Sequence, residues 1–321
     1  MTLSSIRSIA FSVLLIIMSS NLFSDLVDNL KKCKEKTDYH KMLGIDFIYM
    51  INLDQRPEKF LHSSAMLKNY DIHPYRFSAV NGWELSLDVL NDVGLKYHPN
   101  MTPLFATTFP FDGAGEPSYE FMNEVGKTYF VHCISRGAIG CALSHISVLK
   151  DAWDCGYETI WVMEDDIEVI KDPNIISILI DKLDGLVGKE NWDVLFTDRD
   201  FMGRNGEYII AYGAAKRPDM DCSFKQRYSN PYTEDRQISA DFRKISARFG
   251  AHSMIIRRAG IKKLLDFAIE HKIFLAYDLD NYLAPDLNRY ALTYDVVNNW
   301  IQAPSDNGSP AYQENFQRNN E

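Results

Sequence analysis

The chain has 321 residues, enough for one large α/β domain or two small ones with a substantial core. Hydrophobic residues make up 46% of it, charged residues 24% and aromatic residues 12%, which excludes a mostly disordered chain. The net charge of −10 repels phosphate backbones, and no stripe of basic residues interleaved with aromatics overrides it, so we expect no nucleic-acid partner. A phosphorylated small molecule is still compatible with this charge if a metal or a few arginines reverse the local field.

The N-terminal residues have the pattern of a targeting segment. Arg7 precedes an apolar run over residues 9–18, and small residues up to Ser24 follow. This pattern fits a cleaved signal peptide, an uncleaved anchor that associates with a membrane through residues 8–23, or an ordinary buried helix. We expect an exported or membrane-anchored protein, with the cytoplasmic face of a membrane as the second choice.

Composition divides the rest of the chain. The expected segments are a signal or anchor over residues 1–24, a linker or helix over 25–45, one domain with long loop excursions over 46–303, and a flexible polar tail over 304–321. The five cysteines are scattered and contain no CxxC pair, so they predict no zinc site and do not identify the compartment.

The first half of the domain predicts a strand, a helix and a second strand. Residues 46–53 form a short apolar run, and Pro57 then suits the first turn of a helix that reaches residue 69. A second strand over residues 73–80 ends at a turn, so two parallel strands joined by a helix are expected. Residues 97–130 carry four prolines and three glycines, which indicates a long irregular excursion.

The second half continues the α/β alternation. Apolar residues after Ser135 fall on one helical face until Gly156 ends the helix. Residues 159–163 then read as a central strand beside the strand at 46–53, in a mixed α/β sheet flanked by helices. The remaining expected elements are strands at 192–196, 253–256 and 290–297, a helix at 258–270, and a second polar excursion at 199–245.

Three consecutive carboxylates, Glu164, Asp165 and Asp166, follow the strand at 159–163. Ligands of open α/β sheets bind at the carboxyl ends of strands, and adjacent carboxylates repel one another unless a cation neutralises them. Oxygen ligands favour magnesium or manganese. A solvated acidic turn that caps the next segment is the alternative.

Other polar residues leave two interpretations open. His145, next to Ser144 in the expected helix, is either packed and hydrogen-bonded or in contact with substrate. Arg56 either reaches a phosphate or pairs with Asp54 at the surface. Residues 277–280 place two carboxylates at alternate positions of a segment expected to be extended, where they act as a general base or lie solvated in a loop.

Taken together, these patterns resemble glycosyltransferase family 25, the group of lipopolysaccharide-type β-galactosyltransferases and procollagen galactosyltransferases. The resemblance covers roughly residues 46–306. Its matching motifs are FIYMINLDQRPEKF at 47–60, AVNG at 79–82, GAIGCALSH at 137–145 with VMEDD at 162–166, WDVL at 192–195, LDNYLAP at 279–285, and Ser305-Asp306.

The resemblance implies a GT-A-like fold and an inverting transfer of a hexose, galactose or glucose, from a UDP-sugar. The acceptor would be a hydroxyl of a glycan, a lipooligosaccharide or a protein, and the cofactor Mn²⁺ or Mg²⁺. Glu164 and Asp166 would hold the metal, and Asp280 would be the general base, with Asp278 in reserve and Asp198 next. The implied nucleotide-sugar contacts are Asn52, Arg56, Asn81, Gly82, Ser144, His145, Glu164 and Asp165.

Two other classes compete with this interpretation. One is a secreted, catalytically silent relative that binds a glycan, against which the intact acidic triplet argues. The other is a metal-dependent hydrolase, which would usually offer histidines interleaved with aspartates, and the sequence has no such cluster.

Overall fold

The computed structural model describes residues 26–211, 215–220, 233–310 and 312. The expected targeting segment over residues 1–24 and Cys222 therefore lie outside the described residues. Within the described ranges, no helix is long and apolar enough to cross a membrane.

An eight-stranded mixed sheet forms the centre of the domain, in the order β10-β11-β13-β9-β12-β7-β1-β2. β1 (Phe47–Asn52) pairs in parallel with β2 (Tyr75–Ser78) on one side and β7 (Thr159–Glu164) on the other, which confirms the predicted neighbouring strands. β12 (Ser253–Arg257) is antiparallel to both β7 and β9 (Val194–Phe196). The other strands of this sheet are β13 (Arg289–Leu292), β11 (Phe242–Ile245) and β10 (Asp235–Gln237).

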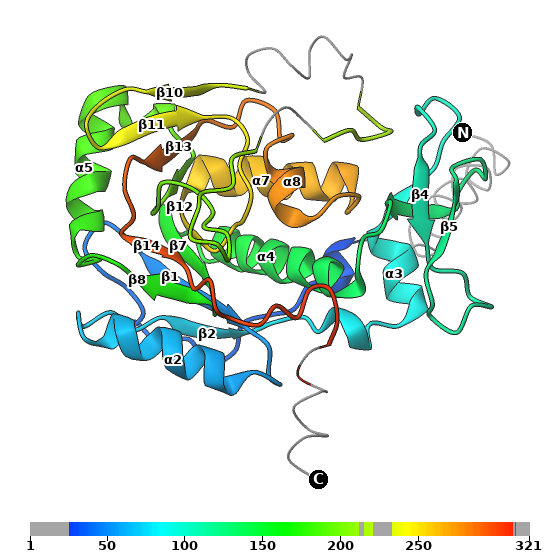
Figure 1. Cartoon of the computed structure of the whole chain (residues 1–321), viewed down its shortest axis with the longest axis horizontal. Coiled ribbons are helices and arrows are strands. Elements are labelled where there is room, and N and C mark those ends of the chain that lie inside the picture. Colours follow the sequence, from blue (N-terminus) through cyan, green and yellow to red (C-terminus); the bar gives the residue numbers. More distant parts are fainter. Residues whose placement is uncertain (1–25, 212–214, 221–232, 311, 313–321) are drawn as a thin grey trace, which may run out of the picture.

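Helices cover both faces of the sheet (Figure 1) because its central strands are apolar on both sides. Along β1, Phe47 and Tyr49 face a core that includes residues of α4 and α7, whereas Ile48 and Met50 face a core that includes residues of α2 and α5. The predicted helices are confirmed within a few residues. The α-helices are α2 (Pro57–Lys68), α3 (Leu87–Val93), α4 (Arg136–Asp154), α5 (Ile175–Val187), α7 (Arg258–His271) and α8 (Tyr277–Asn281), and the 3₁₀ helices are η1 (Leu26–Asn29), η2 (Gly82–Glu84) and η3 (Lys189–Asn191).

The irregular excursion expected over residues 97–130 is wrong in its main feature. This region supplies β4 (Phe105–Thr108), β5 (Ser118–Phe121) and β6 (Thr128–Val131), which form a four-stranded antiparallel sheet with β3 (Leu95–Lys96). The prolines and glycines lie between these strands. Strands of four residues or fewer leave little alternation for the sequence to show.

The strand expected over residues 290–297 is confirmed only in its first part, since the chain leaves the main sheet within it. β13 ends at Leu292, and β14 (Val297–Asn299) pairs with β8 (Ile167–Val169) in a separate two-stranded sheet. The excursion expected over residues 199–245 is partly regular, because β10 and β11 extend the main sheet at its edge. The path of β14 brings the following residues to the end of β7, where Trp300 N–H donates to the Asp166 carbonyl over 2.6 Å.

Candidate active site

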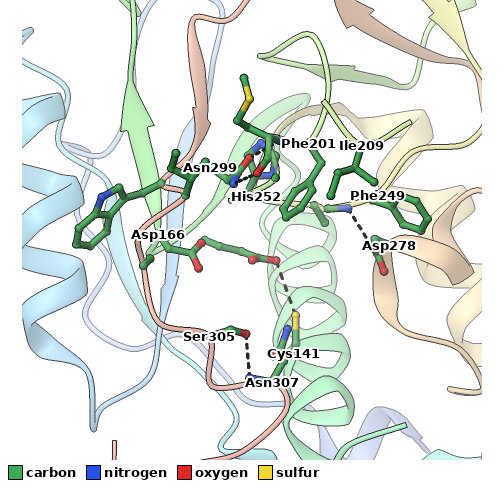
Figure 2. Close-up of a pocket in the computed structure, with 18 of the residues that line it drawn as sticks. Cys141, Asp166, Phe201, Ile209, Phe249, His252, Asp278, Asn299, Ser305 and Asn307 are labelled. Atoms are coloured by element: carbon green, nitrogen blue, oxygen red, sulfur yellow. Dashed lines mark hydrogen bonds between the residues drawn. The ribbon is translucent and has the colours of Figure 1, made fainter. Parts of the chain in front are cut away.

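A cavity of about 640 Å³ opens at the carboxyl end of β7, between α4, the loop at residues 201–209 and the segment at 299–307. Figure 2 shows its side chains converging from these elements and from α8. The acidic lining residues are Glu164, Asp166 and Asp278, and the aromatic ones include Phe201, Phe249, Tyr277 and Trp300. A cavity at this edge of an open α/β sheet is where such folds bind ligands.

The acidic triplet is divided between two sides of the chain, because Glu164 ends β7 and Asp165 and Asp166 form the bend that follows it. Glu164 and Asp166 line the large cavity, whereas Asp165 accepts a hydrogen bond from Asn52 Nδ2 over 2.6 Å on the α2 side. The backbone carbonyl of Asp165 accepts from Ser63 Oγ of α2 over 2.7 Å. Two carboxylates of the triplet are therefore available to a ligand in the large cavity, whereas the third fixes the turn and lines a smaller cavity beside it.

Negative charge is concentrated at this edge. Burial, and then repulsion from Asp166, raise the pKa of Asp165 to about 7, and burial together with Glu164 raises the pKa of Asp166. Burial also opposes ionisation of Glu164, but the hydrogen bond from His145 over 2.9 Å and the electrostatic effect of His145, His252 and Lys59 together outweigh it and lower the pKa of Glu164. Lys59 Nζ lies 3.7, 3.8 and 3.6 Å from Asp165, Asp166 and Asp306, so one ammonium group serves three carboxylates.

The oxygen ligands that a divalent cation requires are present. Glu164 and Asp166 present carboxylate oxygens to the cavity, and a cation would offset both the burial and the charge of Glu164 that raise the pKa of Asp166. Hard oxygen donors suit Mn²⁺ or Mg²⁺. The donor set therefore fits the cofactor that the resemblance implies.

His145 and Ser144 are buried on α4. The His145 ring is 1% exposed and stacks on Tyr277 with ring centroids 4.1 Å apart, so it contacts the lining residues Tyr277 and Glu164 without lining the large cavity itself. Ser144 Oγ donates to the Gly140 carbonyl and accepts from Val80 N–H over 2.8 Å. The surroundings of His145 therefore match the packed, hydrogen-bonded alternative. Ser144 links the chain after β2 to α4.

Arg56 makes a contact that the sequence did not suggest. Its guanidinium, 3% exposed, donates two hydrogen bonds of 2.8 Å to Asp306. The alternative of a surface pair with Asp54 is wrong, because Asp54 pairs with Arg76. Asn52 joins the same region, donating to the Arg56 carbonyl over 2.7 Å and accepting from Arg76 Nε over 2.7 Å.

Asn81 and Gly82 lie beside a smaller cavity of about 90 Å³ that shares Glu164 and Asp166 with the large one. Asn81 caps η2, where its side chain accepts from Trp83 N–H over 3.1 Å. Gly82 touches the first turn of α4 so closely that a Cβ atom would lie 1.8 Å from the Arg136 carbonyl oxygen. The turn predicted after the second strand thus packs directly against the first turn of α4.

Asp278 and Asp280 lie in α8, so the expectation of an extended segment is wrong. In a helix, residues two apart do not share a face. Asp278 lines the large cavity and accepts from Gly250 N–H over 2.9 Å. Asp280 is not among the residues that line it; its carboxylate accepts from Arg217 Nη1 over 2.6 Å and from the backbone N–H groups of residues 274 and 275.

Asp198, the next base candidate, is fully buried between Arg248 Nη2 at 2.8 Å and His252 Nε2 at 3.0 Å. His252 itself lines the large cavity, and its carbonyl accepts from Glu164 N–H over 2.9 Å. The sequence interpretation missed His252. Its position just before the strand predicted at 253–256 would have placed it beside Glu164 if that strand had been read as antiparallel to the one at 159–163.

Comparison with known proteins identifies the family of this chain. The family model described as glycosyltransferase family 25 (LPS biosynthesis protein) matches residues 45–281. A glycosyltransferase 25 family member of Aedes aegypti is 29% identical over 186 residues, which cover 57% of this chain and 26% of that protein. Human procollagen galactosyltransferase 2 is 26% identical over 165 residues, 51% of this chain and 22% of that protein.

A further relative carries a different name. The mouse protein named inactive glycosyltransferase 25 family member 3 is 24% identical over 170 residues, 52% of this chain and 24% of that protein. The matched segments thus span about a quarter of the length of these relatives. The family model matches residues 45–281, well over half of this chain, so the chain belongs to glycosyltransferase family 25.

Proposed function

We propose that this protein transfers a hexose, galactose or glucose, from a UDP-sugar to a hydroxyl group of a glycan, a lipooligosaccharide or a protein, with inversion at the anomeric carbon. The observation that carries the proposal is the convergence of Glu164, Asp166 and Asp278 on one cavity at the carboxyl edge of the sheet, in a chain of family 25. A cavity of about 640 Å³ has the size of small-molecule sites.

The donor diphosphate belongs at the Glu164 and Asp166 end of the cavity. These two carboxylates would hold Mn²⁺ or Mg²⁺, which when bound supplies positive charge to the diphosphate and to the departing UDP. Lys59 and the network around Asp165 keep the strand end rigid beneath that site. The segment at Asn81 and Gly82 borders the same carboxylates through the smaller cavity and supports a nucleotide contact there.

The acceptor hydroxyl belongs near Asp278, which we favour as the general base over Asp280. Asp278 lines the cavity, and burial, with the charge of Glu164, raises its pKa, which makes its carboxylate a stronger base. Asp280 is engaged by Arg217 and by two backbone N–H groups, so it holds α8 and the segment at 215–220 together. Asp280 therefore has a positioning role.

The mouse relative named inactive supports one alternative, a silent protein that binds a glycan without transferring to it. The presence of all three cavity carboxylates favours transfer. A screen for UDP release from several UDP-sugars, with Mn²⁺ and with water, simple glycans or peptides as acceptors, separates the two. Turnover with at least one donor supports the proposal, and glycan binding without turnover of any donor supports the silent alternative.

A further inference from the structure

Three side chains of different chemistry meet at the wall between α4 and β7. Cys141 and His145 are four residues apart on one face of α4, and Glu164 ends the neighbouring strand. One ligand atom from each lies within 4.8 Å of the other two. Within the group, His145 Nε2 is 2.9 Å and Cys141 Sγ is 3.8 Å from Glu164 Oε1.

The donor set of this cluster differs from that of the Glu164 and Asp166 site. A sulfur, an imidazole nitrogen and a carboxylate oxygen are ligands that Zn²⁺ accepts, whereas Mn²⁺ and Mg²⁺ prefer oxygen. Bonds of about 2.0–2.3 Å in a tetrahedral site separate ligand atoms by roughly 3.3–3.7 Å. The distances of 2.9 and 3.8 Å found here lie on either side of that range, so small side-chain shifts would bring the three atoms around a zinc ion. Glu164 and Cys141 also line both cavities, so a cation has a route in and a fourth position open to solvent.

We propose that Cys141, His145 and Glu164 form a zinc-binding site with one position open to the cavity. Binding converts the Cys141 thiol to a thiolate, and its proton is released to solvent as the zinc–sulfur bond forms. Cysteine spacing alone does not reveal such a site, because the fold brings in the carboxylate from 23 residues away. Because Glu164 is shared, zinc at this site withdraws a ligand from the Mn²⁺ site; this last consequence alone rests on the proposed function.

The test uses the whole chain and Zn²⁺ alone, titrated against a chromophoric chelator. Cys141→Ser should weaken zinc binding by at least about 100-fold, since loss of even outer-shell partners of a metal costs about 10–100-fold. Glu164→Gln, which keeps the side-chain volume, should weaken binding as well. Cys133→Ser and Cys155→Ser remove exposed cysteines elsewhere and should leave the affinity unchanged within about twofold.

Substitution of Co²⁺ for Zn²⁺ adds a readout for the sulfur ligand. The wild-type protein should show a cobalt–thiolate absorption band and release a proton on binding, and Cys141→Ser should show neither. Equal zinc affinity of Cys141→Ser and wild type, or no stoichiometric zinc binding by the wild type, overturns the proposal. Zinc binding is measured without any sugar nucleotide, so a failed UDP-release screen leaves it standing.

Discussion

Arg56 and Asp306 form a two-pronged ion pair across 250 residues of the chain, with Nε and Nη2 each 2.8 Å from a carboxylate oxygen. The indole N–H of Trp83 donates to the Asp306 carbonyl over 2.9 Å. Residues 305–307 line the smaller cavity as a result. The start of the expected polar tail is thus held against the loop after the first strand, beside the acidic triplet.

Asp306→Asn should lower the free energy of unfolding by about 3 kcal/mol, because it leaves a buried guanidinium without its main partner. Glu58→Gln is the matched control: Glu58 also contacts Arg56, at 3.3 Å, but its side chain is 61% exposed, so its loss should cost less than about 0.5 kcal/mol. Urea unfolding measures both. Equal, small effects would show that the pair contributes little.

Gly140→Ala should destabilise the protein by about 3 kcal/mol or prevent folding, because the new Cβ would lie 2.4 Å from the Gly82 nitrogen and 2.6 Å from the Val80 carbonyl oxygen. Gly185→Ala in α5 is the control, since nothing lies within 4 Å of its Cβ position and alanine favours a helix by about 1 kcal/mol. Thermal unfolding compares them. A tolerated Gly140→Ala would contradict the close approach of α4 to the chain after β2.

The parts of the fold that the sequence predicted share one property. β1 and β7 are buried on both faces, so each reads as an unbroken apolar run, and α4 has a continuous apolar face. The small sheet escaped prediction because its short strands are separated by prolines and glycines, which made the whole region look irregular. The acidic triplet was recognisable because carboxylates directly after such a strand have few structural explanations.

The contacts that complete the site could not be predicted from the sequence, for a different reason. The partner of Arg56 lies 250 residues away, and no local pattern specifies such a pairing. The choice between Asp278 and Asp280 as the general base depended on whether their segment is extended or helical, because an extended backbone would point both side chains to the same side. A five-residue helix carries too little periodicity to decide that question.

Asp278→Asn should reduce the transfer rate by about 10²- to 10⁴-fold with donor affinity little changed, as expected for loss of a general base. Asp280→Asn should instead lower stability, because it removes the carboxylate that Arg217 contacts over 2.6 Å in the interior. Steady-state kinetics and urea unfolding of both variants separate the roles. A normally stable Asp280→Asn variant with the larger loss of rate would return the base assignment to Asp280.

Asp198 should make stability depend on pH. Burial opposes its ionisation, but Arg248 and His252 outweigh that and lower its pKa below the usual value of about 3.9. Its stabilising contribution is therefore complete above about pH 4 and is lost as the pH falls through the lower, folded-state pKa. The difference in unfolding free energy between wild type and Asp198→Asn should be large at pH 7 and shrink below pH 4. A difference in unfolding free energy that grows as the pH falls would contradict this prediction.

The central claim is that Glu164 and Asp166 bind the donor diphosphate through a divalent cation. Calorimetric titration of UDP into the protein, with and without Mn²⁺, tests it most directly, using Asp166→Asn and the control Asp165→Asn, whose carboxylate faces Asn52. We predict that wild type and Asp165→Asn bind UDP only with Mn²⁺, and that Asp166→Asn loses this binding while keeping its fold. Manganese-dependent UDP binding of equal strength in Asp166→Asn and wild type would contradict the account.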